Sequence, residues 1–348
     1  MNFKCYKIGY APYSVDCKVP GDRRRFAFYA SEKELDYELA DASRKYDLIY
    51  ITSSSNISKW IDYKKANPGT KLIFEIIDFY LAEEKNVLSS LKGITRYLTG
   101  KDKRLYLNYK NAFIDIIKIS DAVVCSTPLQ YAFISQYNKN VHVSLDYFSD
   151  DITHHKTELQ KSKKLKLVWE GQAYTVKNLL ELNDVFKALS DKIELHIITD
   201  PEIKYPFKIF NKKTVDVLRS LNCTYYLHDW EKNSFSKIIA ESDLAIIPMN
   251  MDDKLVYNKP ENKLLLLWEI GIPVLTAVTP AYKRVMDKAG LNYYCGNEGE
   301  WINKIQSFIN NSPQQNSADM DRAREYLYKI HSKESIIENW DKIFLSVG

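Results

Sequence analysis

Long hydrophobic runs are missing from this sequence of 348 residues. No segment approaches the ~20 apolar residues of a membrane-spanning helix, and the opening residues MNFKCYKIGYAPYS lack the apolar core and cleavage site of a signal peptide. Cysteine is scarce: the five are scattered and form no CxxC pair, which predicts reduced thiols and argues against a structural zinc site. A formal net charge of +4 is too small to indicate nucleic-acid binding. We therefore expect a cytoplasmic globular protein.

Strand-like and helical segments alternate through residues 1–150. The strand-like segments are short and apolar, as in buried strands: KCYKIGYA, YDLIYITSS, KLIFEIIDFY, DAVVCSTP and NVHVSLDYF. Between them, EKELDYELADAS, SKWIDYKKA and LQYAFISQY have helical spacing. This alternation predicts a parallel, doubly wound sheet in an N-terminal domain.

The alternation lapses at residues 151–165 and then resumes. The polar, charged segment predicts a linker, and its His154 and His155 lack further ligands at metal-binding spacing. Residues 166–325 repeat the rhythm, with VKNLLELNDVFKAL as an amphipathic helix, and residues 326–348 continue a helical tail. We therefore expect an α/β protein with two Rossmann-like domains, whose strand ends form a central cleft for a ligand.

The segment YNKPENKLLLLWEIGIPV, residues 257–274, is the strongest functional signal. Lys259, Asn262 and Lys263 sit just before an apolar helical run that ends at Gly271. A helix start offers backbone N–H groups and the positive end of the helix dipole, and added lysines suit it to a diphosphate. The alternative is an ordinary helix cap with solvated lysines.

Three segments of the second half carry a family resemblance: WEGQAYTVKNL, HDWEKNSFSKIIAESDLAIIPMN and NKPENKLLLLWEIGIPV. They resemble the GT-B-fold glycosyltransferases of the retaining, group-1 or family-4-like class that build bacterial surface polysaccharides. The resemblance implies a hexosyltransferase-like enzyme that moves a sugar from a nucleotide-diphosphate donor to a capsule, O-antigen or lipopolysaccharide-type glycan. It also implies that the terminal segment YLYKIHSKESIIENWDKIF is a helix crossing back to the N-terminal domain.

The resemblance also implies a set of donor-binding residues. In the family a glycine loop follows a strand, and a cation a few residues later contacts the diphosphate. The residues matched to the donor site are Gly171, Gln172, Lys177, Trp230, Lys259, Glu261, Asn262 and Lys263. Because the family stabilises the leaving diphosphate with side chains and helix dipoles, we expect no cofactor and no obligatory metal.

The sequence departs from the family at one glutamate. Many members carry two glutamates separated by seven residues, the second lying five before the glycine. Glu261 and Glu269 have this separation, but counting back from Gly271 puts Leu266 at the second place. With the glycine setting the register, the usual ribose-binding carboxylate is missing and Glu269 is expected to be structural. The nucleotide and the stereochemistry therefore stay open.

The N-terminal half is expected to hold the acceptor. Arg23, Arg24 and Arg25 follow a turn at Asp22 in the loop after the first strand, and arginine forks suit carboxylate or phosphate groups. Asp22, or Asp78 at a strand end, would orient an acceptor hydroxyl or act as the catalytic base. The alternatives are a solvated basic loop, a plain turn residue at Asp22 and a helix cap at Asp78.

Residues 91–110, LKGITRYLTGKDKRLYLNYK, mix cations with Leu, Ile and Tyr. This composition suits either a face that rests on an anionic membrane or an amphipathic helix packed on its own domain. In the first case the protein is peripheral on the inner face of the plasma membrane, where lipid-linked glycans reside. Two other functions stay open: a nucleotide-sugar 2-epimerase of the same fold, and a non-enzymatic two-lobed solute-binding protein.

Overall fold

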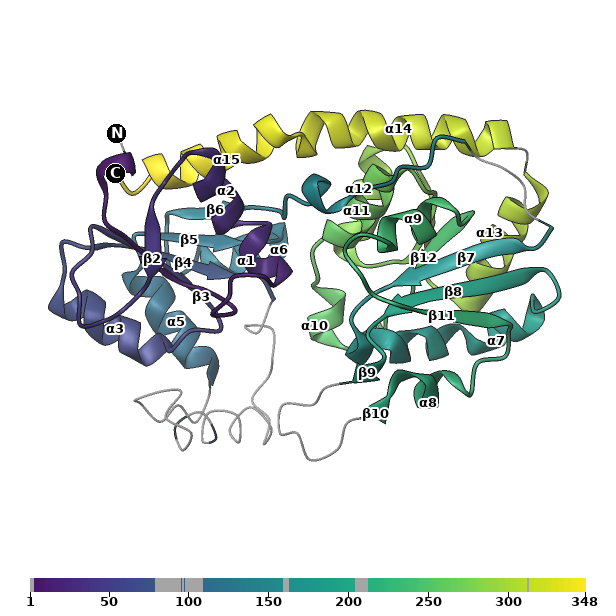
Figure 1. The fold of residues 1–348 in the computed structure, drawn as a ribbon, viewed down its shortest axis with the longest axis horizontal. Helices are drawn as coiled ribbons and strands as arrows, with labels where there is room; N and C mark the ends of the chain where they lie inside the picture. The colour runs from purple at the N-terminus through teal and green to yellow at the C-terminus, as the bar shows by residue number, and fades with distance from the viewer. Residues whose placement is uncertain are drawn as a thin grey trace. The chain divides into compact units, whose positions relative to one another are not determined.

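A computed structural model describes residues 3–78, 95, 97, 109–158, 163–203, 212–311 and 313–348. The chain divides into two compact units, which are described separately. Unit 1 comprises Met1–Tyr147, Asn258–Pro260 and His331–Gly348, and unit 2 comprises Phe148–Tyr257 and Glu261–Ile330. Each unit is built on a six-stranded parallel sheet, as the alternating sequence pattern predicts (Figure 1).

The sheet of unit 1 has the strand order β2-β1-β3-β4-β5-β6, and all its neighbours are parallel. Its strands are β1 (Ile8–Ala11), β2 (Tyr37–Leu39), β3 (Leu48–Thr52), β4 (Lys71–Ile76), β5 (Ala122–Cys125) and β6 (Val141–Val143). Every residue of β3 and β5 is buried, because helices cover both faces of a parallel sheet.

Helices of unit 1 pack on both faces of this sheet. They are η1 (Phe3–Cys5), α1 (Pro20–Arg23), α2 (Phe26–Glu32), α3 (Ile57–Ala66), α5 (Tyr109–Ile119), α6 (Pro128–Ile134) and α15 (Lys333–Leu345). Trp60 and Phe113 bring α3 and α5 into one apolar cluster with the sheet. Phe26, Trp340 and Phe344 bring α2 and α15 into a second cluster with other sheet residues. The last helix of the chain is therefore part of the core of unit 1.

The sheet of unit 2 has the order β11-β8-β7-β12-β13-β14 and is also parallel throughout. Its strands are β7 (Leu165–Glu170), β8 (Ile193–Thr199), β11 (Tyr225–Asp229), β12 (Leu244–Ile247), β13 (Val274–Ala277) and β14 (Tyr294–Cys295). A separate antiparallel pair is formed by β9 (Glu202–Ile203) and β10 (Lys212–Lys213). The chain runs outward from β7 through β8 to β11 and then returns to β12 on the other side of β7, so the strand order reverses between β7 and β12.

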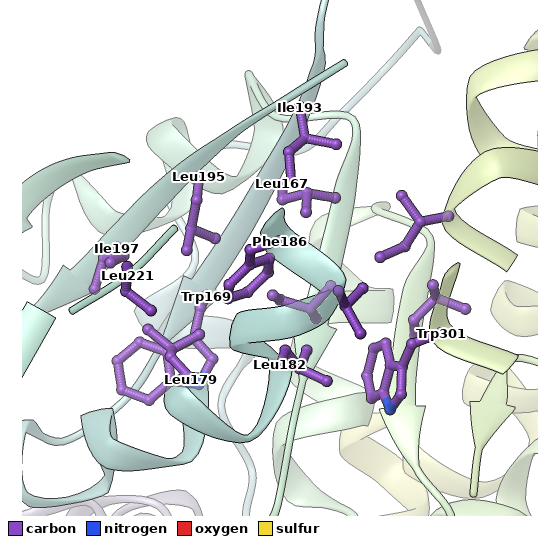
Figure 2. Packing of buried hydrophobic residues seen from close by; sticks show 14 of the residues in the cluster. Leu167, Trp169, Leu179, Leu182, Phe186, Ile193, Leu195, Ile197, Leu221 and Trp301 are labelled. Carbon is purple, nitrogen blue, oxygen red and sulfur yellow. The ribbon is translucent and has the colours of Figure 1, made fainter. Parts of the chain in front are cut away.

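The connections of unit 2 are mostly helical. They are η3 (Ser149–Asp151), η4 (Ala173–Leu182), α7 (Asn183–Ala188), α8 (Thr214–Leu218), α9 (Phe235–Ala240), α10 (Lys254–Tyr257), α11 (Asn262–Ile270), α12 (Pro280–Lys288), α13 (Glu298–Asn310) and α14 (Pro313–His331). Figure 2 shows one core of this unit, in which Trp169 of β7 and Leu195 of β8 meet Phe186 of α7 and Trp301 of α13.

Three local predictions need correction. EKELDYELADAS is not a helix: Glu34 takes the left-handed region at φ 52°, α2 has ended, and Tyr37–Leu39 pair with β1 as an edge strand. The predicted loop after the first strand contains α1 and α2. VKNLLELNDVFKAL is a 3-10 helix followed by a short α-helix, because Val176, Leu179 and Leu182 recur every third residue, the period of a 3-10 helix.

The predicted linker is bound to unit 2 over its described first part. The backbone N–H groups of Thr153 and His154 both donate to Ser236 Oγ, at 3.2 Å. Lys156 is buried, and its Nζ donates to the carbonyl oxygen of Ser242 at 2.8 Å. His154 and His155 are exposed, as expected. Although residues 151–158 are polar in composition, hydrogen bonds hold them to unit 2.

No helix within the described ranges is both long enough and apolar enough to cross a membrane.

Candidate functional site

The carboxyl end of β7 lies at the point where the strand order of unit 2 reverses. In open α/β sheets, ligands bind outside the carboxyl ends of the strands at such a point. Strand β7 ends at Glu170, and Gly171 and Gln172 follow it directly. The predicted glycine loop therefore occupies the position in this sheet where a ligand is expected.

Lys263 reaches this loop from the first turn of α11. Its Nζ donates a hydrogen bond to the backbone carbonyl oxygen of Glu170 and lies 3.6 Å from the Glu170 carboxylate. The same ammonium group lies 5.4 Å from the ring centre of Trp169, within range of a cation–π interaction. The helix start and the glycine loop, which sequence analysis assigned independently to the donor, are thus joined by Lys263.

Gly171 leaves the space that Lys263 uses. A Cβ atom placed on Gly171 would lie 2.8 Å from the Trp169 ring and 2.9 Å from Lys263 Nζ. Both distances are shorter than real Cβ contacts, so any other residue must displace one of these two side chains. The glycine is therefore required by close approach and not only by turn geometry.

Trp230 joins the same group of side chains through Glu170. It follows β11, and its indole Nε1 donates a hydrogen bond of 3.1 Å to Glu170 Oε1. Its ring stacks on Phe235, with ring centres 5.5 Å apart. Trp230, Gly171 and Lys263 were predicted from the sequence, whereas Glu170 was not. The signal for Glu170 was a charged residue at the end of a buried strand, directly before the glycine.

Glu261 precedes α11 and is turned toward α12. Its Oε1 accepts a hydrogen bond from Arg284 at 2.5 Å, while Oε2 is buried and has no hydrogen-bond partner among the described residues. Burial, and then the charge of Glu261, raise the pKa of Tyr282 well above its ordinary value. The side chain of Glu261 makes no capping hydrogen bond to α11.

The other end of α11 matches the sequence prediction. Gly271 takes the left-handed conformation at φ 95°, and its N–H bonds back to the carbonyl oxygen of Leu267 at 3.2 Å. A Cβ at this glycine would lie 2.9 Å from the carbonyl oxygen of Lys156. Glu269 accepts a hydrogen bond of 3.4 Å from Ser149 Oγ, which fits its expected structural role.

The remaining donor predictions are not joined to this cluster. Gln172, directly before η4, and Lys177, within η4, are both exposed. Asn262 is half-buried as the first residue of α11. Lys259 falls within unit 1. These four assignments stay predictions.

In unit 1 the three adjacent arginines have different surroundings. Arg25 is completely buried: its Nε donates to Glu75 Oε1 at 2.5 Å and its Nη1 to Asp146 Oδ1 at 3.0 Å. Burial opposes the charge of Arg25, but Glu75 and Asp146 outweigh it and raise the pKa of the guanidinium. Arg23 and Arg24 are half-buried at the end of α1.

Asp22 is also completely buried, and its contacts are internal. Oδ1 accepts from Tyr10 Oη at 2.5 Å and from the N–H of Tyr13 at 2.8 Å. Oδ2 accepts from the N–H of Ser14 at 2.9 Å and from its hydroxyl at 3.0 Å. A carboxylate has about four acceptor sites, and these donors fill them.

Two of the acceptor-side predictions are therefore not carried forward. Arg25 and Asp22 are completely buried and bonded within unit 1, so neither side chain is exposed to a substrate. Asp78, two residues beyond β4, is half-buried. Asp78, Arg23 and Arg24 stay predictions.

Two further predictions concern metal and membrane. The described part of the chain contains no group of three or more His, Cys, Asp or Glu side chains arranged to hold a metal ion. Most of residues 91–110 lie outside the described residues.

No protein-family model and no curated protein matches this sequence. Solved structures do match its fold. WaaG, a glycosyltransferase involved in lipopolysaccharide biosynthesis, aligns over 98% of this chain and 100% of its own, with 14% identity and a TM-score of 0.59. Anabaena HepE, in complex with UDP and glucose, aligns over 98% and 100%, with 12% identity and a TM-score of 0.63.

A third match is a variant of S. aureus TarM in complex with Fondaparinux, alpha-GlcNAc-glycerol and UDP. It aligns over 85% of this chain with 13% identity and a TM-score of 0.56, and the alignment spans 55% of the TarM chain. Identities this low show the fold alone. The chain therefore has the GT-B fold, with two Rossmann-like domains.

Proposed function

We propose that this protein is a glycosyltransferase that moves a sugar from a nucleoside diphosphate sugar to an acceptor of a surface glycan. The observation that carries the proposal is the Lys263 ammonium group, held against Gly171 where the strand order of unit 2 reverses. Structures of the same fold support it, because they include a lipopolysaccharide glycosyltransferase and complexes with UDP.

In the proposed reaction, the bond between the sugar C1 and the β-phosphate oxygen breaks, and the nucleoside diphosphate leaves with the bonding electrons. The acceptor hydroxyl oxygen forms a bond to C1 and loses its proton. Negative charge grows on the diphosphate, and Lys263 together with the positive end of α11 would stabilise it. Lys177, Asn262 and Gln172, which belong to unit 2, are proposed to add to this donor site.

We assign the acceptor to unit 1. Arg23 and Arg24, on and after α1, are proposed to bind an anionic group of the acceptor. Asp78 is proposed to take the proton of the acceptor hydroxyl or to orient it. All three follow the carboxyl ends of parallel strands, where ligands of such sheets bind.

The finer assignments are a hexosyl donor, retention of the anomeric configuration and no obligatory metal. The resemblance to a retaining, hexosyltransferase-like class supports the first two. The UDP complexes with glucose and with alpha-GlcNAc-glycerol point the same way. The lysine at the donor site supports the third, because a cationic side chain serves the leaving diphosphate without a metal.

The test begins with binding. We expect one nucleoside diphosphate among UDP, GDP, ADP, CDP and thymidine diphosphate to raise the melting temperature of the purified protein. A ligand at 100 times its Kd stabilises the native state by about 2.7 kcal/mol. No shift with any of them at millimolar concentration would contradict the proposal.

The responding nucleotide then identifies the sugar donors to assay. Transfer should require an acceptor, which separates this enzyme from a 2-epimerase, and should persist in EDTA. Proton NMR of the first product should show the anomeric configuration of the donor. Epimerised nucleotide sugar in the absence of acceptor would replace the proposal by the 2-epimerase.

Peripheral membrane binding is a further proposal, and it rests on the composition of residues 91–110. Each lysine or arginine near an anionic surface contributes about 1 kcal/mol, and salt screens this attraction. The protein should therefore sediment with anionic vesicles at low salt and be released at high salt, while neutral vesicles recover much less. Equal recovery with both vesicle types, or none with either, would favour a soluble acceptor.

A further inference from the structure

We propose that Glu170 binds the ribose hydroxyls of the donor nucleotide and makes the site selective for ribonucleotides. This inference rests on the proposed function and names one recognition element within its donor site. It concerns the last residue of β7, which was not among the residues matched to the donor site.

The usual source of such a carboxylate is absent from α11. Leu266 stands where the donor motif would place a glutamate, and it is a buried residue in the apolar middle of the helix. Glu269, the one acidic residue of α11, accepts a hydrogen bond from Ser149. Glu261, directly before α11, is buried and bonded to Arg284, and its side chain is 6% exposed. Glu170 is the more exposed carboxylate, at 14%.

Glu170 has acceptor capacity to spare. Its Oε1 takes one hydrogen bond from Trp230 Nε1, while Lys263 Nζ stands 3.6 Å from Oε2, beyond hydrogen-bond distance. Since a carboxylate offers about four acceptor sites, hydroxyl donors find room on it. The side chain is 14% exposed, so a ligand can reach it.

The neighbours of Glu170 match the order of groups in a nucleotide. Lys263, which would bind the diphosphate, lies 3.6 Å from Oε2. The half-buried indole of Trp230 donates to Oε1 and stacks on Phe235, and it offers an aromatic surface for a base. The ribose lies between the base and the phosphates in every nucleotide. A carboxylate placed between these two partners is positioned for the 2′ and 3′ hydroxyl groups.

If Glu170 had a purely electrostatic role, Glu170→Gln would have the opposite effect on nucleotide binding. If Glu170 only neutralised Lys263, then Glu170→Gln would release the lysine and strengthen the binding of any phosphate. If Glu170 binds the ribose, the same change weakens ribonucleotides specifically. Glu170→Gln keeps the size of the side chain and an acceptor for Trp230, so it isolates the charge.

The experiment is calorimetric titration of the full-length protein with UDP, 2′-deoxy-UDP, thymidine diphosphate and inorganic pyrophosphate. If GDP, ADP or CDP gives the largest thermal shift, that nucleotide and its deoxy form replace UDP and 2′-deoxy-UDP. Hydrogen bonds to a charged group are worth about 1.5–3 kcal/mol, which corresponds to roughly tenfold to hundredfold in affinity. Wild-type protein should therefore bind the ribonucleotide at least about tenfold more tightly than its deoxy form. Glu170→Gln should abolish most of this difference and leave pyrophosphate binding equal or stronger.

Glu181→Gln, an exposed glutamate on η4, is the matched control and should behave as wild type. Equal affinity of the wild type for ribo and deoxy forms, a preference for thymidine diphosphate, or unchanged ribonucleotide binding by Glu170→Gln would overturn the inference. These outcomes leave the proposed function standing, whereas the absence of any nucleoside diphosphate binding would remove the proposed function itself.

Discussion

Replacing Lys263 with alanine should lower the rate of glycosyl transfer about a hundredfold or more. The ammonium group is held at the glycine loop by the Glu170 carbonyl oxygen and the Trp169 ring, where the leaving diphosphate is expected. Removing one preorganised group that meets developing charge costs about 3–4 kcal/mol of transition-state stabilisation. The measurement is kcat/KM for transfer, with circular dichroism and melting temperature as checks of folding.

Gly171→Ala should give a loss of similar size through a different route. The added methyl group cannot coexist with Trp169 and Lys263 in their present places, so one of these side chains must shift, which disturbs the packing of the lysine against the Trp169 ring and the loop. Lys187→Ala, an exposed lysine on α7, is the matched control and should retain wild-type turnover. Lys177→Ala tests the second predicted cation, for which we expect a loss of the same order. Turnover near wild type in both Lys263→Ala and Gly171→Ala would remove the donor assignment.

Replacing Arg25 with methionine should destabilise unit 1 by about 3–5 kcal/mol, because it leaves Glu75 charged and buried without its partner. Burial already raises the pKa of Glu75, against the pull of Arg25, so the loss of the guanidinium raises it further. For a unit of this size, the expected fall in melting temperature is roughly 10 °C. Calorimetry that resolves the transition of unit 1 from that of unit 2 provides the measurement.

The control for Arg25→Met is Lys45→Met, an exposed cation of the same unit, which should change stability by less than about 0.5 kcal/mol. Adding Glu75→Gln to Arg25→Met should recover much of the loss, since no uncompensated Glu75 charge then remains. Equal stability of Arg25→Met and Lys45→Met would refute the account of the buried ion pair. Acceptor binding should accordingly be tested with Arg23→Ala and Arg24→Ala, keeping Arg25.

These contacts show why the three adjacent arginines could not be sorted from the sequence. Arg23, Arg24 and Arg25 have the same chemistry and nearly the same neighbours along the chain. Their difference arises because Glu75 of β4 and Asp146 after β6 converge on the buried Arg25. Asp22 misled for a similar reason: turn residues are usually exposed, but here the backbone of Tyr13 and Ser14 folds over the carboxylate.

The sequence alone determined the class of fold, the parallel sheets, the end of α11 at Gly271 and the two segments that meet at the glycine loop. These features depend on local patterns, because apolar runs, helical spacing and a glycine at a helix end involve residues that are close together in the sequence. Only the tertiary structure decided that EKELDYELADAS contributes a strand, that Arg25 and Asp22 are internal, and that Glu170 joins Trp230 to Lys263. Each of these outcomes depends on strand pairing or on charged groups brought together from distant parts of the chain. The local spacing of residues does not indicate such contacts.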